Sequence, residues 1–147
     1  MAPIIYLDTH VVAWLYAGQL DLLTPGVKER IEGHGLLISP AVELELQYLY
    51  EVRRTAEPAT VVLETLERVA GLAVCTLPFR EVAEVALGQS WTRDPFDRLI
   101  VSQAVLRGTA LLTKDRMIRA HCPLAFWDDL RPPEPAQPPP VGTDLTS

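Results

Sequence analysis

The sequence predicts a single α/β domain, in which a mostly parallel sheet of four or five strands is covered by helices on both faces. Short, continuous apolar runs such as Ile4–Leu7 alternate along the chain with longer segments that carry helical signals. Three of those segments open with a capping residue followed by proline, at Thr24-Pro25, Ser39-Pro40 and Asp94-Pro95. Because parallel strands need a crossover connection, usually a helix, this alternation favours a parallel sheet.

Length and composition are typical of one globular domain. The chain has 147 residues and is 48% hydrophobic, enough to bury a core. No apolar run approaches the length of about 20 residues that a membrane span needs, and the N-terminus lacks the pattern of a signal peptide. The two cysteines, Cys75 and Cys122, have no metal-ligand spacing and form no disulfide framework. We therefore expect a cytoplasmic protein with ordinary thiols and no membrane partner.

The first half of the chain should contain two strands and four helices. The strands are apolar runs, and Gly33 ends the second helix. In chain order we expect strand Ile4–Leu7, helix Val11–Ala17, helix Pro25–Ile31, strand Leu36–Ile38, helix Pro40–Arg54 and helix Pro58–Val69.

The second half should complete the sheet and end in a tail. Gly108 follows the basic Arg107 and ends the helix that begins at Pro95. In order we expect strand Ala73–Leu77, helix Phe79–Leu87, helix Pro95–Arg107, strand Ala110–Thr113, helix Lys114–Ala120 and edge strand Ala125–Trp127. Residues 132–147 are rich in proline and poor in apolar side chains, so the domain should span 1–131 and the remainder should be a disordered, inert tail.

Two aspartates follow predicted strands, at the edge of the sheet where α/β proteins form their sites. Asp8 ends the first strand, and Asp115 lies two residues beyond the strand Ala110–Thr113. Aspartate also favours turns and helix starts, so these two acids alone do not establish a site.

The helix from Pro40 carries two glutamates that helical spacing separates. Glu43 groups with polar residues and should face water, whereas Glu45 groups with apolar residues and should face inward. The apolar stripe comprises Ala41, Leu44, Tyr48, Leu49 and Val52, and the polar one Gln47, Glu51 and Arg54. An inward carboxylate is costly unless it is paired or binds a metal.

The helix from Pro95 carries a similar pair. Asp94 is the evident N-cap, while Asp97 aligns with Ile100, Val101 and Ala104 along the apolar side. Their spacing resembles a capping box with aspartate in place of the usual glutamate or glutamine. Capping explains Asp94 well but explains Asp97 less well, since a capping side chain need not face the core.

Four acids from four elements can therefore converge: Asp8, Glu45, Asp97 and Asp115. Such a cluster repels itself without a cation, and hard oxygen ligands suit Mg²⁺ or Mn²⁺. Ions of this kind can activate water for phosphodiester hydrolysis. No histidine–serine pair offers a rival mechanism, and for His10, beside Asp8, we favour a structural role.

Charge is less informative than the acids. The net charge of −6 argues against binding of nucleic acid by bulk electrostatics. Residues 93–131 carry seven basic groups against five acids, which favours a positive surface only if some of those acids bind a cation. From charge alone, an ordinary mixed surface is the better interpretation.

At these residues the chain resembles a known family. The segments Tyr6-Leu7-Asp8-Thr9-His10, Ile38-Ser39 with Glu45, Asp94-Pro95-Phe96-Asp97-Arg98 and Leu112-Thr113-Lys114-Asp115 resemble the four motifs of PIN-domain proteins, above all VapC-type toxins of toxin–antitoxin pairs. Each motif alone is weak, but the four in this order are specific. The likeness covers about residues 3–130.

That resemblance implies an Mg²⁺- or Mn²⁺-dependent endoribonuclease that forms a homodimer and is neutralised by an antitoxin. Carried over residue by residue, the catalytic and metal-binding acids are Asp8, Glu45, Asp97 and Asp115. Thr113 would support them with its hydroxyl, and Asp94 would assist through a water or only cap its helix. Arg98, Lys114 and Arg116 are the expected contacts to the RNA substrate.

Other classes fit less well. A phosphoryl-accepting receiver domain would need an acidic pair before the loop of the first strand, where Asp8 stands alone. It would also need a lysine at the end of its last strand, and here Lys114 is followed directly by Asp115, so the match is poor. A haloacid-dehalogenase-like phosphatase would need aspartate at the position of His10. A PIN-like module that binds RNA or protein without cutting remains the main alternative.

Overall fold

The structure, a computed structural model, describes residues 3–128. The predicted tail at 132–147 lies outside the described residues. None of the helices within 3–128 is long and apolar enough to cross a membrane. Both cysteines in that range are buried free thiols.

The described chain forms one five-stranded sheet in the order β3-β2-β1-β4-β5, and every pairing is parallel. The strands are β1 (Ile4–Leu7), β2 (Gly35–Ile38), β3 (Ala73–Val74), β4 (Leu111–Leu112) and β5 (Ala125–Phe126). The central β1 places Tyr6 opposite Leu37 of β2 and Leu111 of β4. Ile5, Tyr6 and Leu7 are buried, as a strand covered on both faces requires. The predicted fold class is confirmed.

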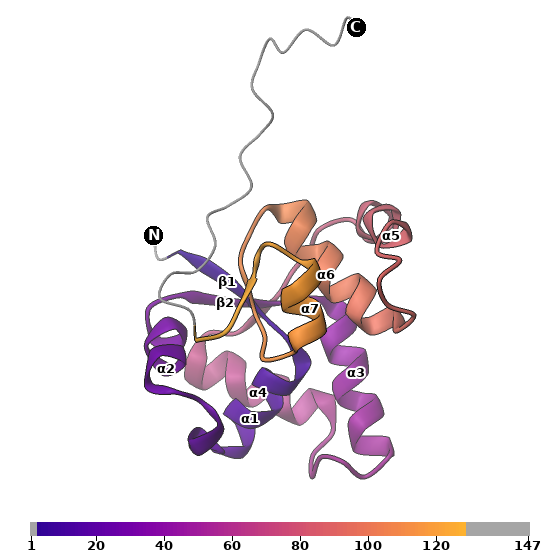
Figure 1. Cartoon of the computed structure of the whole chain (residues 1–147). Helices are drawn as coiled ribbons and strands as arrows, with labels where there is room; N and C mark the ends of the chain where they lie inside the picture. Colours follow the sequence, from indigo (N-terminus) through magenta and orange to yellow (C-terminus); the bar gives the residue numbers. More distant parts are fainter. Residues whose placement is uncertain (1–2, 129–147) are drawn as a thin grey trace, which may run out of the picture.

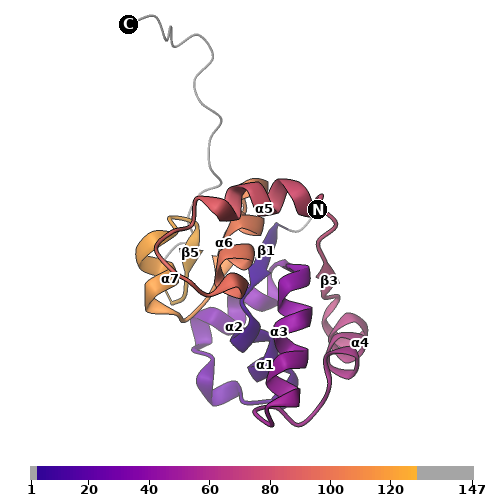
Figure 2. The ribbon, with the colours of Figure 1, turned by 90° about the vertical axis from the view of Figure 1, so that its right-hand side faces the viewer.

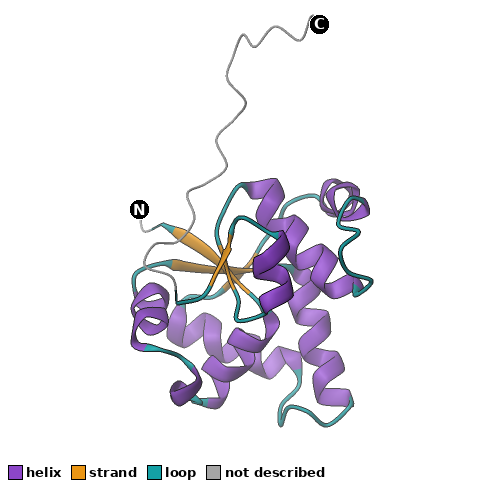
Figure 3. Cartoon of the chain, viewed as in Figure 1, coloured by secondary structure: helices purple, strands orange, loops and turns teal. Residues whose placement is uncertain are grey.

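Helices cover the sheet on both sides (Figures 1 and 3). Figure 1 shows α1, α2 and α4 on one side of the sheet and α6 on the other, with α3 running along one end. Within residues 3–128 the helices are α1 (Thr9–Ala17), α2 (Pro25–Glu32), α3 (Pro40–Glu51), α4 (Ala59–Ala70), α5 (Phe79–Leu87), α6 (Pro95–Arg107) and α7 (Arg116–His121). In Figure 2, which views the molecule from the side, α3 runs next to α1, with which it is in contact.

Side-chain caps fix where several of the helices begin. Each of the three predicted cap–proline pairs places proline at the first helical residue. The Thr24 hydroxyl accepts from the Val27 amide, and the Ser39 hydroxyl accepts from the Ala41 amide. Because these signals are local in the sequence, they could be interpreted without knowledge of the fold.

Several element ends differ from the sequence prediction. Helix α1 begins at Thr9 rather than Val11, because Asp8 serves as its N-cap. Helix α3 ends at Glu51 rather than Arg54, because Arg53 adopts a left-handed conformation with φ of 62°. Strand β3 is shorter than predicted, and a short 3₁₀ helix at Leu20–Leu22 was not predicted.

The predicted apolar stripe of α3 is wrong for three of its five residues. Leu44, Tyr48 and Val52 are exposed, with 63%, 52% and 44% of their surface accessible. Ala41 and Leu49 are buried as predicted, and the helix buries Val42 and Leu46 beside them. Both sides of this helix carry large apolar residues, so periodicity alone could not decide which one faces α1 and α4.

Candidate active site

Asp8 lies at the carboxyl end of β1, and each of its two carboxylate oxygens accepts a hydrogen bond. Its Oδ1 accepts a hydrogen bond of 2.8 Å from the Thr9 amide, and its Oδ2 accepts one of 2.7 Å from the Thr113 hydroxyl. The residue is only 5% exposed. Burial raises the pKa of this carboxyl, and the bonds from Thr113 and Thr9 partly oppose that shift.

Thr113 connects Asp8 to Asp115. Its buried oxygen, besides donating to Asp8, accepts a 3.1 Å hydrogen bond from the Asp115 amide. Asp115 caps α7 through Oδ1, which accepts from the amides of Met117 and Ile118 at 2.8 and 3.1 Å. The Asp115 side chain is exposed, and its charge contributes to the raised pKa values of Asp8 and Asp97.

Glu45 approaches the same place from α3. It is half-buried, and burial is the main reason that its pKa is raised. The nearby charges of Asp8 and Asp94 raise the pKa further, whereas Thr9 and His10 lower it. Glu45 is therefore electrostatically coupled to the carboxylate at the end of β1.

Glu43 lies elsewhere. It lines a hollow of about 410 Å³ against α4, whose Thr60, Glu64 and Glu67 line the same hollow. The two glutamates of α3 thus serve different surfaces, in agreement with their angular separation. The prediction that Glu43 faces water holds only in part, since the residue is half-buried.

The carboxyl group of Asp97 is strongly perturbed. Burial raises the pKa of Asp97 to about 7, and the charges of Asp94, Asp8, Asp115 and Glu45 add to the effect. Among residues 3–128, no group donates a hydrogen bond to this carboxylate. A half-buried acid without a donor is costly in its ionised form.

Asp94 has a different role from Asp97. Its Oδ1 accepts from the Phe96 amide at 2.8 Å and from the Asp97 amide at 3.4 Å, so it caps α6. The reciprocal half of a capping box is missing, because the Asp94 amide donates to the Thr92 hydroxyl instead. Capping therefore explains Asp94 but not Asp97.

The four predicted acids are brought within electrostatic reach of one another, from the ends of β1 and β4 and from α3 and α6. Among the described residues, however, no three Asp, Glu, His or Cys side chains stand close enough to enclose a metal ion. This is compatible with Mg²⁺, which keeps several waters and commonly binds only one or two carboxylates directly. The donor set consists of carboxylate oxygens, the type that Mg²⁺ and Mn²⁺ prefer.

The three basic residues expected at the RNA differ in their surroundings. Arg98 donates from Nε to the Thr92 carbonyl at 2.9 Å and from a terminal nitrogen to the Ala86 carbonyl at 3.5 Å. These bonds hold the loop before α6 in place. Lys114 and Arg116 are exposed beside Asp115, and the Lys114 ammonium lies 5.8 Å from the centre of the Trp14 ring.

Two residues next to Asp8 were not predicted to belong to the site. The Thr9 hydroxyl is buried and has no hydrogen-bond partner within residues 3–128, although it lies close enough to lower the pKa of Glu45. His10 is exposed, and its charge lowers the pKa of both Asp8 and Glu45. Adjacency to Asp8 was the available sequence signal for both.

Comparison with known proteins identifies the family. A sequence profile described as the PIN domain matches residues 5–122. This chain belongs to the PIN-domain family. The chain is 33% identical over 129 residues to Ribonuclease VapC22 of Mycobacterium tuberculosis (strain ATCC 25618 / H37Rv). This alignment covers 84% of this chain and 98% of the relative. The predicted resemblance to VapC-type proteins is confirmed.

A solved structure confirms the fold of the PIN domain. VapBC2 from Rickettsia felis, bound to a DNA fragment from its promoter, aligns with a TM-score of 0.61 at 17% sequence identity. The alignment covers 84% of this chain and 96% of the matched one.

Proposed function

We propose that this PIN domain is a divalent-metal-dependent endoribonuclease and acts as the toxin of a toxin–antitoxin pair. The observation that supports it best is the convergence of carboxylates from four separate elements at the carboxyl edge of the sheet. The similarity to a protein named Ribonuclease VapC22, over most of both chains, supports the same assignment.

The proposed metal ligands are Asp8, Glu45, Asp97 and Asp115. Three of these have raised pKa values, caused by burial and by one another's charge, so a cation among them would relieve an existing cost. Mg²⁺ or Mn²⁺ bound there would supply Lewis-acid activation of water and of the phosphodiester.

The chain's own groups orient these ligands. Thr113 and the Thr9 amide fix the two oxygens of Asp8, and Asp94 fixes the start of the helix that carries Asp97. Lys114 and Arg116, exposed next to Asp115, would attract the phosphates of RNA. Arg98 would act indirectly, by holding the loop that precedes α6.

An antitoxin protein is the proposed regulatory partner, since the matched Rickettsia felis structure is of VapBC2. We also propose a cytoplasmic location, where the RNA substrate would be found. An acidic pocket suited to cations would accept an arginine from such a partner equally well. We also propose a homodimer. The exposed Leu44, Tyr48 and Val52 of α3 form an apolar surface of the kind that protein interfaces bury.

The central experiment compares cleavage by wild-type protein and by Asp8→Asn. With Mg²⁺ or Mn²⁺ the wild type should cut single-stranded or looped RNA, and EDTA should stop it. Asp8→Asn should abolish cutting while leaving the thermal midpoint unchanged or raised, because it relieves carboxylate repulsion. Equal cutting by both proteins would exclude this site. RNA binding without any cutting by the wild type would favour the non-cutting module.

A further inference from the structure

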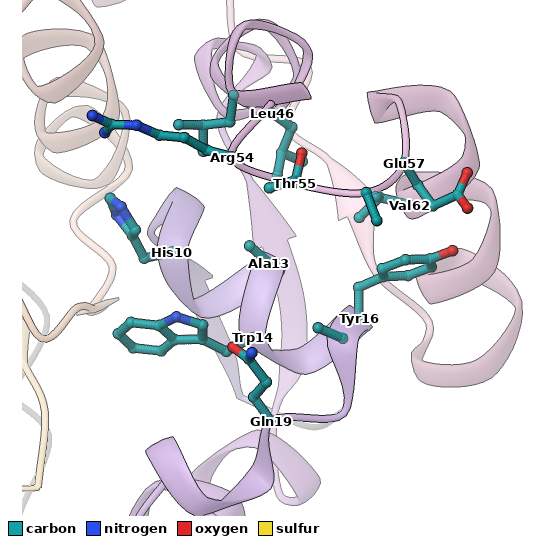
Figure 4. A pocket seen from close by; sticks show the side chains of 13 residues that line it. His10, Ala13, Trp14, Tyr16, Gln19, Leu46, Arg54, Thr55, Glu57 and Val62 are labelled. Carbon is teal, nitrogen blue, oxygen red and sulfur yellow. The ribbon is translucent and has the colours of Figure 1, made fainter. Parts of the chain in front are cut away.

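A cavity of about 700 Å³ lies between α1, the loop that joins α3 to α4, and α4 itself. Figure 4 shows it from close by. Its size falls within the range of small-molecule pockets, and its walls combine apolar, aromatic and polar groups. The residues on which the argument rests are His10, Trp14, Tyr16, Arg54, Thr55 and Glu57.

The cavity adjoins the acidic site through His10. This residue lines the cavity, stands two positions after Asp8, and acts electrostatically on Asp8 and Glu45. The neighbour of Glu45 on α3, Leu46, lines the cavity as well. An RNA strand bound at the acids can therefore extend directly into the cavity.

The cavity is polarised along its length. Figure 4 shows His10 and Arg54 on the left of the cavity and Tyr16 and Glu57 on the right. The exposed Arg54 side chain forms no ion pair within residues 3–128. The positive end of the cavity, which carries Arg54, is thus also the end of His10, the residue that acts on Asp8 and Glu45.

Aromatic rings occupy the wall beside this positive end. The rings of His10 and Trp14 are 6.1 Å apart, and the Lys114 ammonium lies 5.8 Å from the centre of the Trp14 ring. Thr55, which lines the cavity, contributes a buried hydroxyl without a hydrogen-bond partner among residues 3–128. Rings, a guanidinium and an unsatisfied hydroxyl are the groups with which proteins hold unstacked RNA bases.

We propose that this cavity is a nucleobase-binding subsite, in which one base of the RNA packs against His10 and Trp14 while Arg54 contacts an adjacent phosphate. The subsite rests on the proposed ribonuclease function, because it would hold a nucleotide next to the bond that is cut. A protein segment could also occupy a cavity of this size, but the cations at its entrance fit a nucleotide better than an apolar side chain.

The test uses mononucleotides as probes, so that it needs neither metal nor turnover. The full chain is titrated in EDTA with AMP, GMP, CMP and UMP, and with ribose 5-phosphate as the matched ligand that lacks a base. The indole N–H signals are followed by NMR, and Trp14→Phe assigns the signal of Trp14. At least one nucleotide should shift that signal and bind about tenfold more tightly than ribose 5-phosphate.

Variants then locate the binding. His10→Ala and Arg54→Ala change exposed side chains and should each weaken nucleotide binding several-fold with the fold intact by circular dichroism. Arg68→Ala removes an exposed charge on α4 away from the cavity and should leave binding unchanged. Because the side chains of His10, Arg54 and Arg68 are exposed, their replacement should not disturb folding. The test therefore does not depend on whether Trp14→Phe folds.

Three outcomes would overturn the subsite. The first is equal affinity for nucleotides and ribose 5-phosphate. The second is an equal loss of nucleotide affinity in Arg68→Ala and Arg54→Ala. The third is that the cavity variants weaken antitoxin binding but not nucleotide binding. The last would assign the cavity to a protein partner. Since none of these measurements involves cleavage, failure of the subsite is distinguishable from failure of the ribonuclease, which the Asp8→Asn comparison decides.

Discussion

The hydroxyl of Thr113 donates to Oδ2 of Asp8 over 2.7 Å, although the two residues are 105 positions apart in the sequence. This bond joins the carboxyl ends of the neighbouring strands β1 and β4, whose register pairs Leu7 with Leu112. It fixes the orientation of the Asp8 carboxylate and opposes the rise in its pKa that burial causes.

Removing that hydroxyl should change the pH dependence of cleavage. In Thr113→Val the pKa of Asp8 should rise further, because a bond that favours the ionised form is lost. We expect a cleavage rate about 10- to 100-fold lower, with the acidic limb of the pH–rate profile moved to higher pH. Thr113→Ser keeps the hydroxyl and should retain the profile. Identical limbs in the Val and wild-type proteins would contradict this role.

The two glutamates of α3 should differ sharply in their effect on activity. Positions 43 and 45 point about 200° apart on a helix, so both cannot reach one site. Glu45→Gln should lower cleavage by orders of magnitude and weaken Mn²⁺ binding with the fold intact, because Glu45 is coupled to Asp8.

Glu43→Gln is the matched control on the same helix. Glu43 lines the hollow against α4, so this change should leave cleavage and Mn²⁺ binding within a few-fold of wild type. Mn²⁺ titration with parallel RNA cleavage assays measures both variants. The reverse pattern would show that Glu43 is the ligand.

Asp97 should make the metal-free protein less stable as pH rises. Its pKa is about 7 in the folded state against 3.8 for the unperturbed group, so the folded protein binds the proton more tightly. The contribution of Asp97 to the free energy of unfolding should be largest below about pH 4 and should be lost as the pH rises towards 7. Asp8 and Glu45, whose pKa values are also raised, should act in the same direction.

Thermal melts in EDTA across this pH range measure the effect. Asp97→Asn should flatten the fall in melting temperature, because the amide has no charge to bury. Added Mn²⁺ should restore stability to the wild type at neutral pH and do so less in the variant. An unchanged slope in Asp97→Asn would mean that this carboxyl does not carry the pH dependence.

The exposed apolar surface of α3 should mediate the proposed homodimer. Leu44→Glu places a charge on a side chain that is 63% exposed, so the monomer should fold normally while the dimer dissociates. Leu20→Glu, at a 48% exposed leucine of the 3₁₀ helix, is the control and should not dissociate it. Sedimentation or light scattering gives the mass. A wild-type protein that is monomeric at high concentration would contradict the dimer.

The sequence by itself determined the order of elements, the parallel sheet and the starts of the helices that open with a capping residue and proline. Those features depend on local chemistry. Ser39 and Asp94 cap the first turns of their helices through neighbouring backbone amides, and the apolar run Ile4–Leu7 forms a strand that is buried from Ile5 onward. The positions of the four acids followed from the same local order.

The tertiary structure alone decided which side of α3 is buried and how the acids interact. Leu44 is as apolar as Leu46 and Leu49, so only packing against α1 and α4 could choose between them. Glu45 is nonetheless coupled to Asp8, because it lies at the border of the buried side, next to Ala41 and Leu49 along the helix.

The raised pKa of Asp97 and the cavity beside His10 likewise depend mainly on tertiary structure. Asp94 is a local contributor to the raised pKa, but burial and the charges of Asp8, Asp115 and Glu45 come from packing of remote segments. Arg54 reaches the cavity from a loop far from Trp14 in sequence. Burial and charge coupling depend on distances between segments that are remote along the chain, and only the folded structure sets those distances.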